Sequence, residues 1–368
     1  MIILMTVQER KHWIAFSCFT QIGPKRFFLL RKYFGKAEKA WKARKETLLK
    51  IGLKEKLVLD FIKFRESFDP PSYFLRLKKL GIETVTFEDK DYPENLKNID
   101  DAPFLLYILG EILAKDSLSI GVVGTRKITS YGKEVTEKLV SDLVASGLTI
   151  VSGLAFGVDS VAHNAALSLG GRTIGVWAGG LDSVIPGYRK YLVEKIVKSS
   201  QGAVVSEFPL GFHPRPETFP QRNRIISGLS LGVLVTEAAE DSGSLITASW
   251  AAQQGREVFA VPGPITSQQT AGTAKLLKTG AKLVYNVKDI LDELEIERRA
   301  KKEVAREILP ENKEEEIILK MLENEVKHID QIIKETGMDS GKIASILTMM
   351  EIKGKIKNLG GMVYALAR

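Results

Sequence analysis

The chain has 368 residues, of which 44% are hydrophobic and 27% are charged, an ordinary globular composition with room for two or three domains. The single cysteine, Cys18, excludes an internal disulfide and a zinc site built from cysteines. No apolar run approaches the ~20 residues that cross a bilayer, and the apolar run 1–5 is too short for a secretory signal. We therefore expect a cytoplasmic protein without membrane contact.

The net charge of +8 is concentrated near the N-terminus. Residues 1–65 contain 16 Lys and Arg against 5 Asp and Glu, a net charge of +11, whereas the other 303 residues carry a net charge of −3. Such a basic block favours a polyanionic partner or an acidic protein surface. A solvated helical domain rich in lysine explains the charge equally well.

Residues 1–117 are predicted to form an N-terminal helical domain followed by a connector. Apolar residues recur at helical spacing on both sides of Gly23-Pro24, which predicts a tight turn between two helices. The turn resembles a helix-hairpin-helix or sterile-alpha-motif-like unit that can hold a DNA backbone, but the second glycine of that hairpin is missing, which favours plain packing. In the connector, Tyr73–Leu80 is predicted to be a helix and Ile82–Phe87 a strand.

From Leu118 on, strands alternate with amphipathic helices, the pattern of a parallel sheet covered on both faces. The predicted strands are 118–123, 149–152, 173–178, 203–207, 231–236, 257–261 and 282–285, and helices between them include 133–145, 158–169 and 245–254. We therefore predict the α/β class, with an extended Rossmann-like sheet over 118–290. Ligands bind beyond the carboxyl ends of such strands, so functional residues are expected in the turns that follow them.

The first two of these turns contain small residues and one arginine. The turn Gly124-Thr125-Arg126 is not a dinucleotide fingerprint, because an arginine stands where small residues are needed, and Arg126 suits a phosphate contact. The second turn, Ser152-Gly153, allows close backbone approach to a ligand. Asp159 and His163 follow at i and i+4 on one helix face. They could be an acid–base pair or metal ligands, but a structural role in which they bond to each other or to neighbours is favoured.

The next turns add glycines and carboxylates to the same edge. Gly179-Gly180 is the third turn, while Glu207 and Glu237 follow the next two strands. Two glutamates could perform acid–base chemistry, but carboxylates also orient arginines through charge-assisted hydrogen bonds. We favour the orienting role, since Arg126, Arg222 and Arg224 are expected nearby.

The stretch 218–247 carries the strongest signal for an anion. Arg222-Asn223-Arg224 begins a helix-like run, an apolar strand follows, and the loop Ser242-Gly243-Ser244 then opens another helix. A strand, a small-residue loop and a helix start together hold anions through backbone N–H groups and the helix dipole. Guanidinium groups add a planar, bidentate reach toward phosphate. The polymer that we expect here is single-stranded nucleic acid.

The C-terminal part is predicted to be a separate small domain. A charged linker, 291–313, leads into 314–368, where three helices and two strands around Gly360-Gly361 indicate a winged helix. Winged helices bind DNA or protein. The third helix carries only Lys342 as a basic residue, which argues against strong reading of the major groove, so a protein contact is at least as well supported.

The motifs together resemble the DNA-processing protein A (DprA, also called Smf) family. In chain order they are Gly124-Thr125-Arg126, 152–159 with Ala162-His163, 178–182, Ser206-Glu207, 219–230, Glu237-Ala238, 242–248 and 255–263. The resemblance implies a helical N-terminal domain, a Rossmann-like domain and a winged helix. It also implies a cytoplasmic homodimer that needs no cofactor, binds single-stranded DNA during natural transformation and loads the RecA recombinase onto it. Where many members have Tyr-Pro-x-x-Asn, this chain has 185–189, Ile-Pro-Gly-Tyr-Arg, and Tyr188 and Arg189 could substitute.

We therefore predict a DNA-binding protein that is not an enzyme, without catalytic residues, a metal or a cofactor. The predicted DNA- or phosphate-binding residues are Gly124, Thr125, Arg126, Ser152, Gly153, Gly179, Gly180, Arg222, Asn223, Arg224, Ser242, Gly243 and Ser244. The alternative is a nucleotide-processing enzyme of the phosphoribohydrolase-like Rossmann group, although its Pro-Gly-Gly-x-Gly-Thr-x-x-Glu motif is missing from 237–247. A third hypothesis is a protein-binding adaptor that works through the winged helix and the basic N-terminal block.

Overall fold

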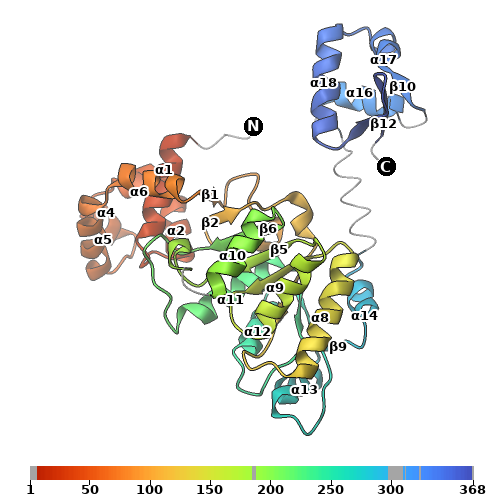
Figure 1. The fold of residues 1–368 in the computed structure, drawn as a ribbon. Coiled ribbons are helices and arrows are strands. Elements are labelled where there is room, and N and C mark those ends of the chain that lie inside the picture. Colours follow the sequence, from red (N-terminus) through yellow and green to blue (C-terminus); the bar gives the residue numbers. More distant parts are fainter. Residues whose placement is uncertain (1–5, 185–187, 297–309, 311, 323–324, 367–368) are drawn as a thin grey trace. The chain divides into compact units, whose positions relative to one another are not determined.

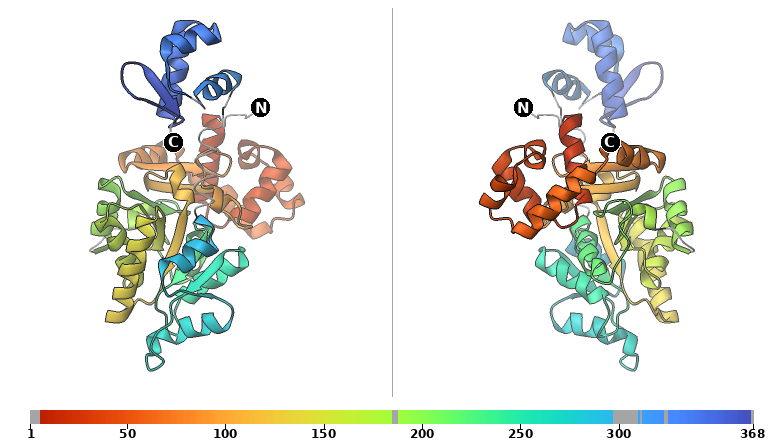
Figure 2. Two further views of the ribbon diagram at one scale, coloured as in Figure 1. Left: turned by 90° about the vertical axis from the view of Figure 1, so that its right-hand side faces the viewer. Right: turned by 90° about the vertical axis from the view of Figure 1, so that its left-hand side faces the viewer.

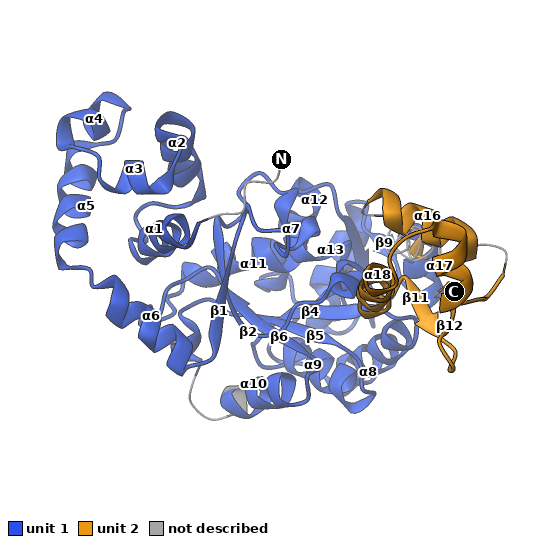
Figure 3. Cartoon of the chain, turned by 90° about the horizontal axis from the view of Figure 1, so that it is seen from above, with its two compact units in different colours: residues 1–294 blue, residues 295–368 orange. Residues whose placement is uncertain are grey.

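The computed structural model describes residues 6–184, 188–296, 310, 312–322 and 325–366. The chain divides into two compact units, residues 1–294 and 295–368 (Figure 3). The predicted boundary at residue 117 falls inside the first unit, and the predicted linker 291–313 begins close to the division. Most of that linker lies outside the described residues. The division into four segments stays a prediction.

The N-terminal part of the first unit consists of short helices, as the periodicity predicts. They are α1 (Val7–Cys18), α2 (Pro24–Phe34), α3 (Ala37–Trp41), α4 (Lys45–Lys50), α5 (Glu55–Ser67) and α6 (Pro70–Lys79). Gly23 caps α2 in an extended conformation and Pro24 occupies its first position, where a missing N–H costs nothing. Aromatic rings fill the interior, with Trp13 edge-on to Phe27 at 4.7 Å and Phe16 stacked on Phe61 at 5.3 Å.

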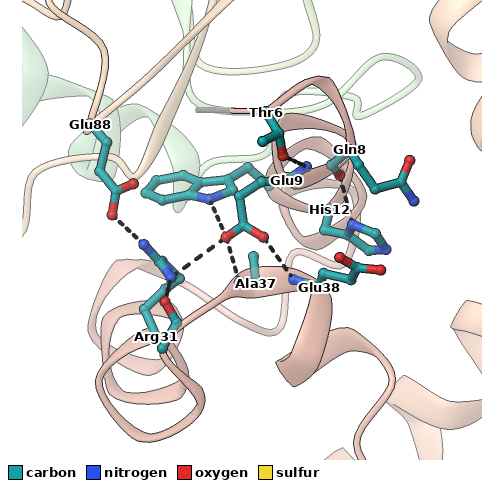
Figure 4. A network of polar contacts seen from close by, with 10 residues as sticks. Thr6, Gln8, Glu9, His12, Arg31, Ala37, Glu38 and Glu88 are labelled. Carbon is teal, nitrogen blue, oxygen red and sulfur yellow. Dashed lines mark hydrogen bonds and ion pairs between the residues drawn. The ribbon is translucent and has the colours of Figure 1, made fainter. Parts of the chain in front are cut away.

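A buried carboxylate, Glu9, joins three of these helices (Figure 4). Its Oε1 accepts hydrogen bonds from the backbone N–H of Ala37 at 2.6 Å and from Nε1 of Trp13 at 3.3 Å, and Oε2 accepts one from the N–H of Glu38 at 3.2 Å. Glu9 thereby satisfies the free amides at the start of α3. Arg31 of α2 lies 3.5 Å from Glu9 and also pairs with Glu88, which follows the first strand of the sheet.

The sheet of the first unit has nine strands in the order β1-β2-β6-β5-β4-β3-β7-β8-β9. Their bounds are β1 (Ile82–Thr86), β2 (Leu105–Gly110), β3 (Ser119–Val123), β4 (Thr149–Gly153), β5 (Thr173–Val176), β6 (Gly202–Ser206), β7 (Gly232–Val235), β8 (Glu257–Ala260) and β9 (Lys282–Leu283). The seven strands predicted from residue 118 on are parallel neighbours, so the predicted α/β class is confirmed. Strand β2, which the sequence pattern did not predict, pairs antiparallel with both β1 and β6.

Strand β2 joins the N-terminal helices to the sheet. Its residues alternate between two cores: Leu105 and Tyr107 pack with the aromatic residues of the N-terminal helices, whereas Leu106 and Ile108 pack with the opposite face of the sheet. Phe104, just before β2, stacks on Phe27 of α2 at 3.9 Å. The N-terminal helices therefore share a continuous core with the sheet.

Helices cover both faces of the sheet (Figures 1 and 3). On one face lie α8 (Ser130–Ala145), α9 (Val158–Ser168) and α10 (Tyr188–Lys198), and on the other α7 (Glu94–Lys97), α11 (Thr218–Leu229) and α12 (Ser244–Gln253). Helices α13 (Ala271–Lys278) and α14 (Val287–Glu293) follow β8 and β9. The N-terminal helices lie beside the β1 end of the sheet and α13 lies near the other end (Figure 2).

The second unit has the predicted winged-helix elements. They are α16 (Lys313–Leu322), β10 (Lys327–His328), α17 (Ile329–Thr336), α18 (Ser340–Ile352), β11 (Ile356–Asn358) and β12 (Val363–Leu366). Gly360 and Gly361, with φ of 102° and 58°, form the turn between β11 and β12, a backbone conformation that favours glycine. On α18, Lys342 pairs with Glu314 of α16 at 2.5 Å, so the one basic residue of that helix is engaged within the unit. Across the described ranges of both units, no helix is long and apolar enough to span a membrane.

We predict that Glu9→Ala lowers the free energy of unfolding by about 1–3 kcal/mol, because two backbone amides and an indole N–H lose their buried acceptor. Glu9→Gln keeps one acceptor oxygen and should lose less. Chemical denaturation followed by tryptophan fluorescence measures both changes. Glu46→Ala, on the exposed surface of α4, is the control, and equal stability of Glu9→Ala and Glu46→Ala would contradict the role of Glu9.

Candidate nucleic-acid interface

A pocket of about 530 Å³ lies beyond the carboxyl ends of β3, β4 and β7. It is lined by residues that follow these strands and by the first turns of α11 and α12. Seven of the thirteen predicted residues line it, namely Gly124, Arg126, Arg222, Asn223, Ser242, Gly243 and Ser244. The expectation that functional residues gather at this edge of the sheet therefore agrees with the fold for these seven.

Arg126 supplies an exposed positive charge at this pocket. It follows β3, and its guanidinium lies over the ring of Phe219 at 5.6 Å from the centroid. Two backbone hydrogen bonds hold the turn that carries it. The N–H of Thr125 donates to the Glu237 carbonyl at 2.7 Å, and the N–H of Val158 donates to the Thr125 carbonyl at 3.1 Å. Thr125 itself is buried, and its hydroxyl donates to Gln269 at 2.9 Å instead of facing the pocket.

Arg222 reaches the pocket from α11 and is 4% exposed. Its Nη1 donates to the carbonyl of Val176, the last residue of β5. A Cβ atom on Gly153 would lie 2.4 Å from that Nη1 and 2.4 Å from Oδ2 of Asp159. Gly153 therefore makes room for Arg222 and Asp159, which is a different role from the predicted ligand contact. Its neighbour Ser152 is also buried, with its hydroxyl donating to the Val122 carbonyl at 2.6 Å.

Asp159 is the acidic group of this pocket. Burial raises the pKa of its carboxyl from 3.8 to about 6, although the nearby Arg222 charge and the N–H of Ala155 act in the opposite direction. The carboxylate accepts a hydrogen bond from that N–H at 3.3 Å. At pH 7 the ionised Asp159 therefore offsets part of the positive charge of the pocket.

His163 does not form an acid–base pair with Asp159. Its Nε2 donates to the Gly153 carbonyl at 2.7 Å, and its Nδ1 lies 2.7 Å from Oγ1 of Thr173. Burial lowers the pKa of this histidine from 6.5 to about 4. The interpretation that His163 hydrogen-bonds to its neighbours is thus confirmed. Among the ranges that the structure describes, no group of three His, Cys, Asp or Glu side chains is arranged to hold a metal ion.

Arg224 was predicted to bind DNA or phosphate, but it does not line the pocket. It is 6% exposed, its Nε lies 3.2 Å from Asp101, and its Nη2 pairs with Glu207, a carboxyl whose pKa burial raises. The reason is helical geometry: successive residues of α11 are about 100° apart, so residues 222 and 224 point about 200° from one another. Of the pocket-lining residues of this helix, 219, 222, 223 and 226 follow the i, i+3, i+4, i+7 spacing of one face, and Pro220 lies beside them.

The two glutamates of this edge have different partners. Glu207 orients an arginine, as expected, but this arginine is the buried Arg224. For Glu237 the orienting role is wrong, because its carboxylate accepts hydrogen bonds from the N–H and the hydroxyl of Thr129, at 2.8 and 2.5 Å. Thr129 caps α8, so Glu237 fixes the start of that helix.

The Gly179-Gly180 turn does not line the pocket but holds a loop beside it. The N–H of Gly180 donates to the Phe212 carbonyl at 2.8 Å. A Cβ atom on Gly179 would lie 2.8 Å from Cδ of Pro214, and one on Gly180 would lie 2.3 Å from the Pro209 carbonyl oxygen. Both glycines are needed for this close approach, which explains them without a phosphate.

The Ser242-Gly243-Ser244 loop opens α12 at the edge of the pocket, and the hydroxyls of Ser242 and Ser244 lie 2.8 Å apart. The N–H groups of Leu245 and Ile246 already donate to the carbonyls of Ser242 and Gly243, at 3.0 and 3.3 Å, so it is the dipole of α12 that favours an anion here. Asn223 of α11 donates to the Gly243 carbonyl at 3.3 Å and so joins the two helices. Phe219 is a lining residue that was not among the predicted ones, although the helical periodicity of 218–229 places it on the face of Arg222.

The segment 185–187, where the sequence departs from the usual family pattern, lies outside the described residues. The side chains of Tyr188 and Arg189 are also outside the description, so their substituting role stays a prediction.

Comparisons with known proteins place the chain in a family. The family model of the DNA recombination-mediator protein A matches residues 83–295, and that of the DprA winged helix domain matches residues 301–362. The Smf protein of Synechocystis is 32% identical over 98% of this chain and 99% of its own length. The DNA processing protein DprA of Bacillus subtilis is 43% identical over 62% of this chain and 77% of its own.

Solved structures of proteins with these names are also similar to this chain. The DNA processing protein A of Streptococcus pneumoniae matches with a TM-score of 0.65 and 33% identity, over 77% of this chain and 97% of that one. The protein of the same name from Helicobacter pylori, described for its single-stranded DNA binding mode, matches with a TM-score of 0.52 and 29% identity, over 59% of this chain and 96% of that one. With the fold, the pocket and both family models in agreement, the chain belongs to the DNA recombination-mediator protein A (DprA/Smf) family.

Proposed function

We propose that this protein binds single-stranded DNA, independently of base sequence and without cleaving it, in the pocket defined above. The observation that carries the proposal is the convergence of Arg126, Arg222 and the N-terminal end of α12 on one pocket. Two guanidinium groups and a helix N-terminus form a surface that complements phosphate. The Helicobacter pylori relative, a protein described for binding single-stranded DNA, supports the choice of polymer.

The Arg126–Phe219 pair favours an unpaired strand over a duplex. Bases of single strands stack on aromatic rings and on planar guanidinium groups, and every base offers such a face, so this contact tolerates any sequence. In a duplex the bases are already stacked and paired, so their faces are not available for stacking on a side chain. A gel shift with matched single- and double-stranded oligonucleotides tests this preference.

The alternative of a nucleotide-processing enzyme gains no support from the pocket. It needs an available general base, but the Glu237 carboxylate is held by Thr129 and the His163 imidazole by Gly153 and Thr173. The remaining carboxylate of the pocket, Asp159, lies beside the Arg222 charge and accepts the N–H of Ala155. Incubation with nucleoside monophosphates, followed by detection of free base, tests the alternative directly. Release of base that disappears in Glu237→Gln would replace the binding function with this one.

The wider assignment rests on family membership. We propose that the protein acts in the cytoplasm as a homodimer and loads the RecA recombinase onto DNA taken up in natural transformation. Relatives named DNA processing protein support a role in handling DNA. Strand-exchange assays with single-strand-binding protein already on the DNA test the loading step, and sedimentation measures the dimer.

We predict that Arg126→Ala weakens binding to every oligonucleotide about tenfold and lowers the salt slope by about 0.7, the loss of one phosphate contact on a single strand. Arg224→Ala should behave differently, because it leaves the buried Glu207 and Asp101 without their cation. We expect it to lower the free energy of unfolding by about 3–5 kcal/mol. Fluorescence anisotropy across a salt series and thermal melting measure the two effects. Lys138→Ala, exposed on α8, is the control, and an unchanged slope in Arg126→Ala would contradict the assigned pocket.

We predict that affinity for oligothymidylate rises as the pH falls from 7.5 to 5.5. Asp159 ionises with a pKa of about 6, so it is mostly negative at pH 7.5 and mostly neutral at pH 5.5, and phosphodiesters keep their charge throughout. Asp159→Asn should bind more tightly at pH 7.5 and flatten the pH dependence. Both proteins carry His213→Gln in this experiment, so that the exposed histidine of the neighbouring loop does not contribute. Parallel pH profiles in the two proteins would exclude Asp159 as the titrating group.

A further inference from the structure

A second arginine–phenylalanine pair lies in the loop before α11, in residues that no motif identified. The ring of Phe212 stacks on Phe208 with centroids 4.6 Å apart and planes 12° apart. The guanidinium of Arg215 lies over Phe212 at 5.5 Å from its centroid. This geometry closely matches the pair of Arg126 and Phe219, at 5.6 Å, in the pocket.

The loop that carries this pair is fixed at both ends. The N–H of Gly211 donates to Asp182 at 2.9 Å, and the N–H of Leu210 donates to the hydroxyl of Tyr73, from α6, at 2.9 Å. At the other end, the N–H of Arg215 donates to the Thr218 hydroxyl at 3.0 Å, which returns a hydrogen bond to the Arg215 carbonyl at 2.9 Å. With Gly180 holding the Phe212 carbonyl, the ring is positioned before any ligand arrives.

The charge and exposure of the pair fit a nucleic acid. Arg215 is exposed and Phe212 is partly exposed. In the described part of the chain, Arg215 makes no ion pair, whereas the buried Arg224 pairs with two carboxylates. A structural cation would be expected to have such partners. An exposed guanidinium over a pre-positioned ring offers a planar surface for a base and hydrogen-bond donors for a phosphate.

The pair is also continuous with the pocket. Pro216 follows Arg215 directly and lines the pocket, as does Phe219, which is one helical turn further on. A polymer that leaves the pocket along this side therefore meets Arg215 and Phe212. In the chain, only residues 216–218 separate Arg215 from Phe219, the ring of the pocket pair.

We propose that Phe212 and Arg215 form a second subsite, which stacks one base of the DNA strand outside the pocket while the guanidinium contacts an adjacent phosphate. The subsite deepens the proposed function and rests on it. It extends the binding path from the pocket toward the N-terminal helices, and it accepts only unpaired bases. Since stacking needs a ring but no particular base, it adds affinity without adding sequence preference.

The test uses the full chain and oligonucleotides that separate bases from phosphates. Each has a short thymidine core, flanked either by thymidines or by abasic residues that keep the phosphates. For the unmodified protein, thymidine flanks should bind at least about fivefold more tightly than abasic flanks. Phe212→Ala should remove this difference and leave binding of the abasic-flanked oligonucleotide unchanged, while Phe212→Trp should keep it. Arg215→Ala should weaken both, and Arg215→Lys should restore mainly the phosphate contribution.

Tyr285→Ala is the matched control, because this aromatic residue is 83% exposed and lies near β9, away from the loop. A 2-aminopurine in the flank adds a direct readout, since its fluorescence is quenched on stacking and should stay bright in Phe212→Ala. Equal weakening of both oligonucleotides by Phe212→Ala would overturn the stacking role, as would equal affinity of the unmodified protein for both. Failure of the unmodified protein to bind either oligonucleotide would instead overturn the proposed function.

Discussion

The angular spacing of side chains on α11 determines which of its residues line the pocket. One face of this helix, with Arg222 and Asn223, lines the pocket, and Arg224, about 200° away, neutralises Asp101 and Glu207 in the interior. A single helix thus supplies two buried cations two residues apart, one at the pocket and one paired with interior carboxylates. The ion pairs of Arg224 connect the end of β6 with the segment before β2, so they fix the helix whose other face lines the pocket.

Gly153, Gly179 and Gly180 contribute to the pocket because they let neighbouring groups pack closely. Gly153 leaves the space in which Arg222 and Asp159 meet, and Gly179 with Gly180 allows the loop 209–214 to lie against the third turn. The pocket is therefore built from side chains that neighbouring backbones hold in place. Arg126 is the exception, since it reaches solvent from a turn whose backbone is anchored by Glu237. Preorganised groups of this kind bind an anion without first being ordered.

The sequence sufficed for the parallel strands, since each is an apolar run bounded by turn residues, and for the edge of the sheet where the pocket lies. It also sufficed for Arg126 and for Ser242-Gly243-Ser244, because their positions follow from the strand that precedes them. It did not suffice for Arg224, Gly179 or Ser152, whose direction depends on helix phase and on partners distant in the chain. Strand β2 was not predicted, because it directly follows a segment with Pro103. It is also buried on both faces, which removes the alternation of polar and apolar residues.

Helix α6 contacts the loop 209–216 at two points, through the hydroxyl of Tyr73 and through Arg76, which pairs with the same Asp182 that accepts the N–H of Gly211. Tyr73 is in turn bonded to Tyr107 of β2 at 3.1 Å. The N-terminal helices therefore carry the basic block and also help to hold the loop that contains Phe212. A shortened protein that begins after α6 would keep the sheet edge that forms the pocket, and the loop would keep its hydrogen bonds to Gly180 and Asp182, but the bond from Leu210 to Tyr73 would be lost. The loop that carries Phe212 would then be held less firmly, although none of its own residues had changed.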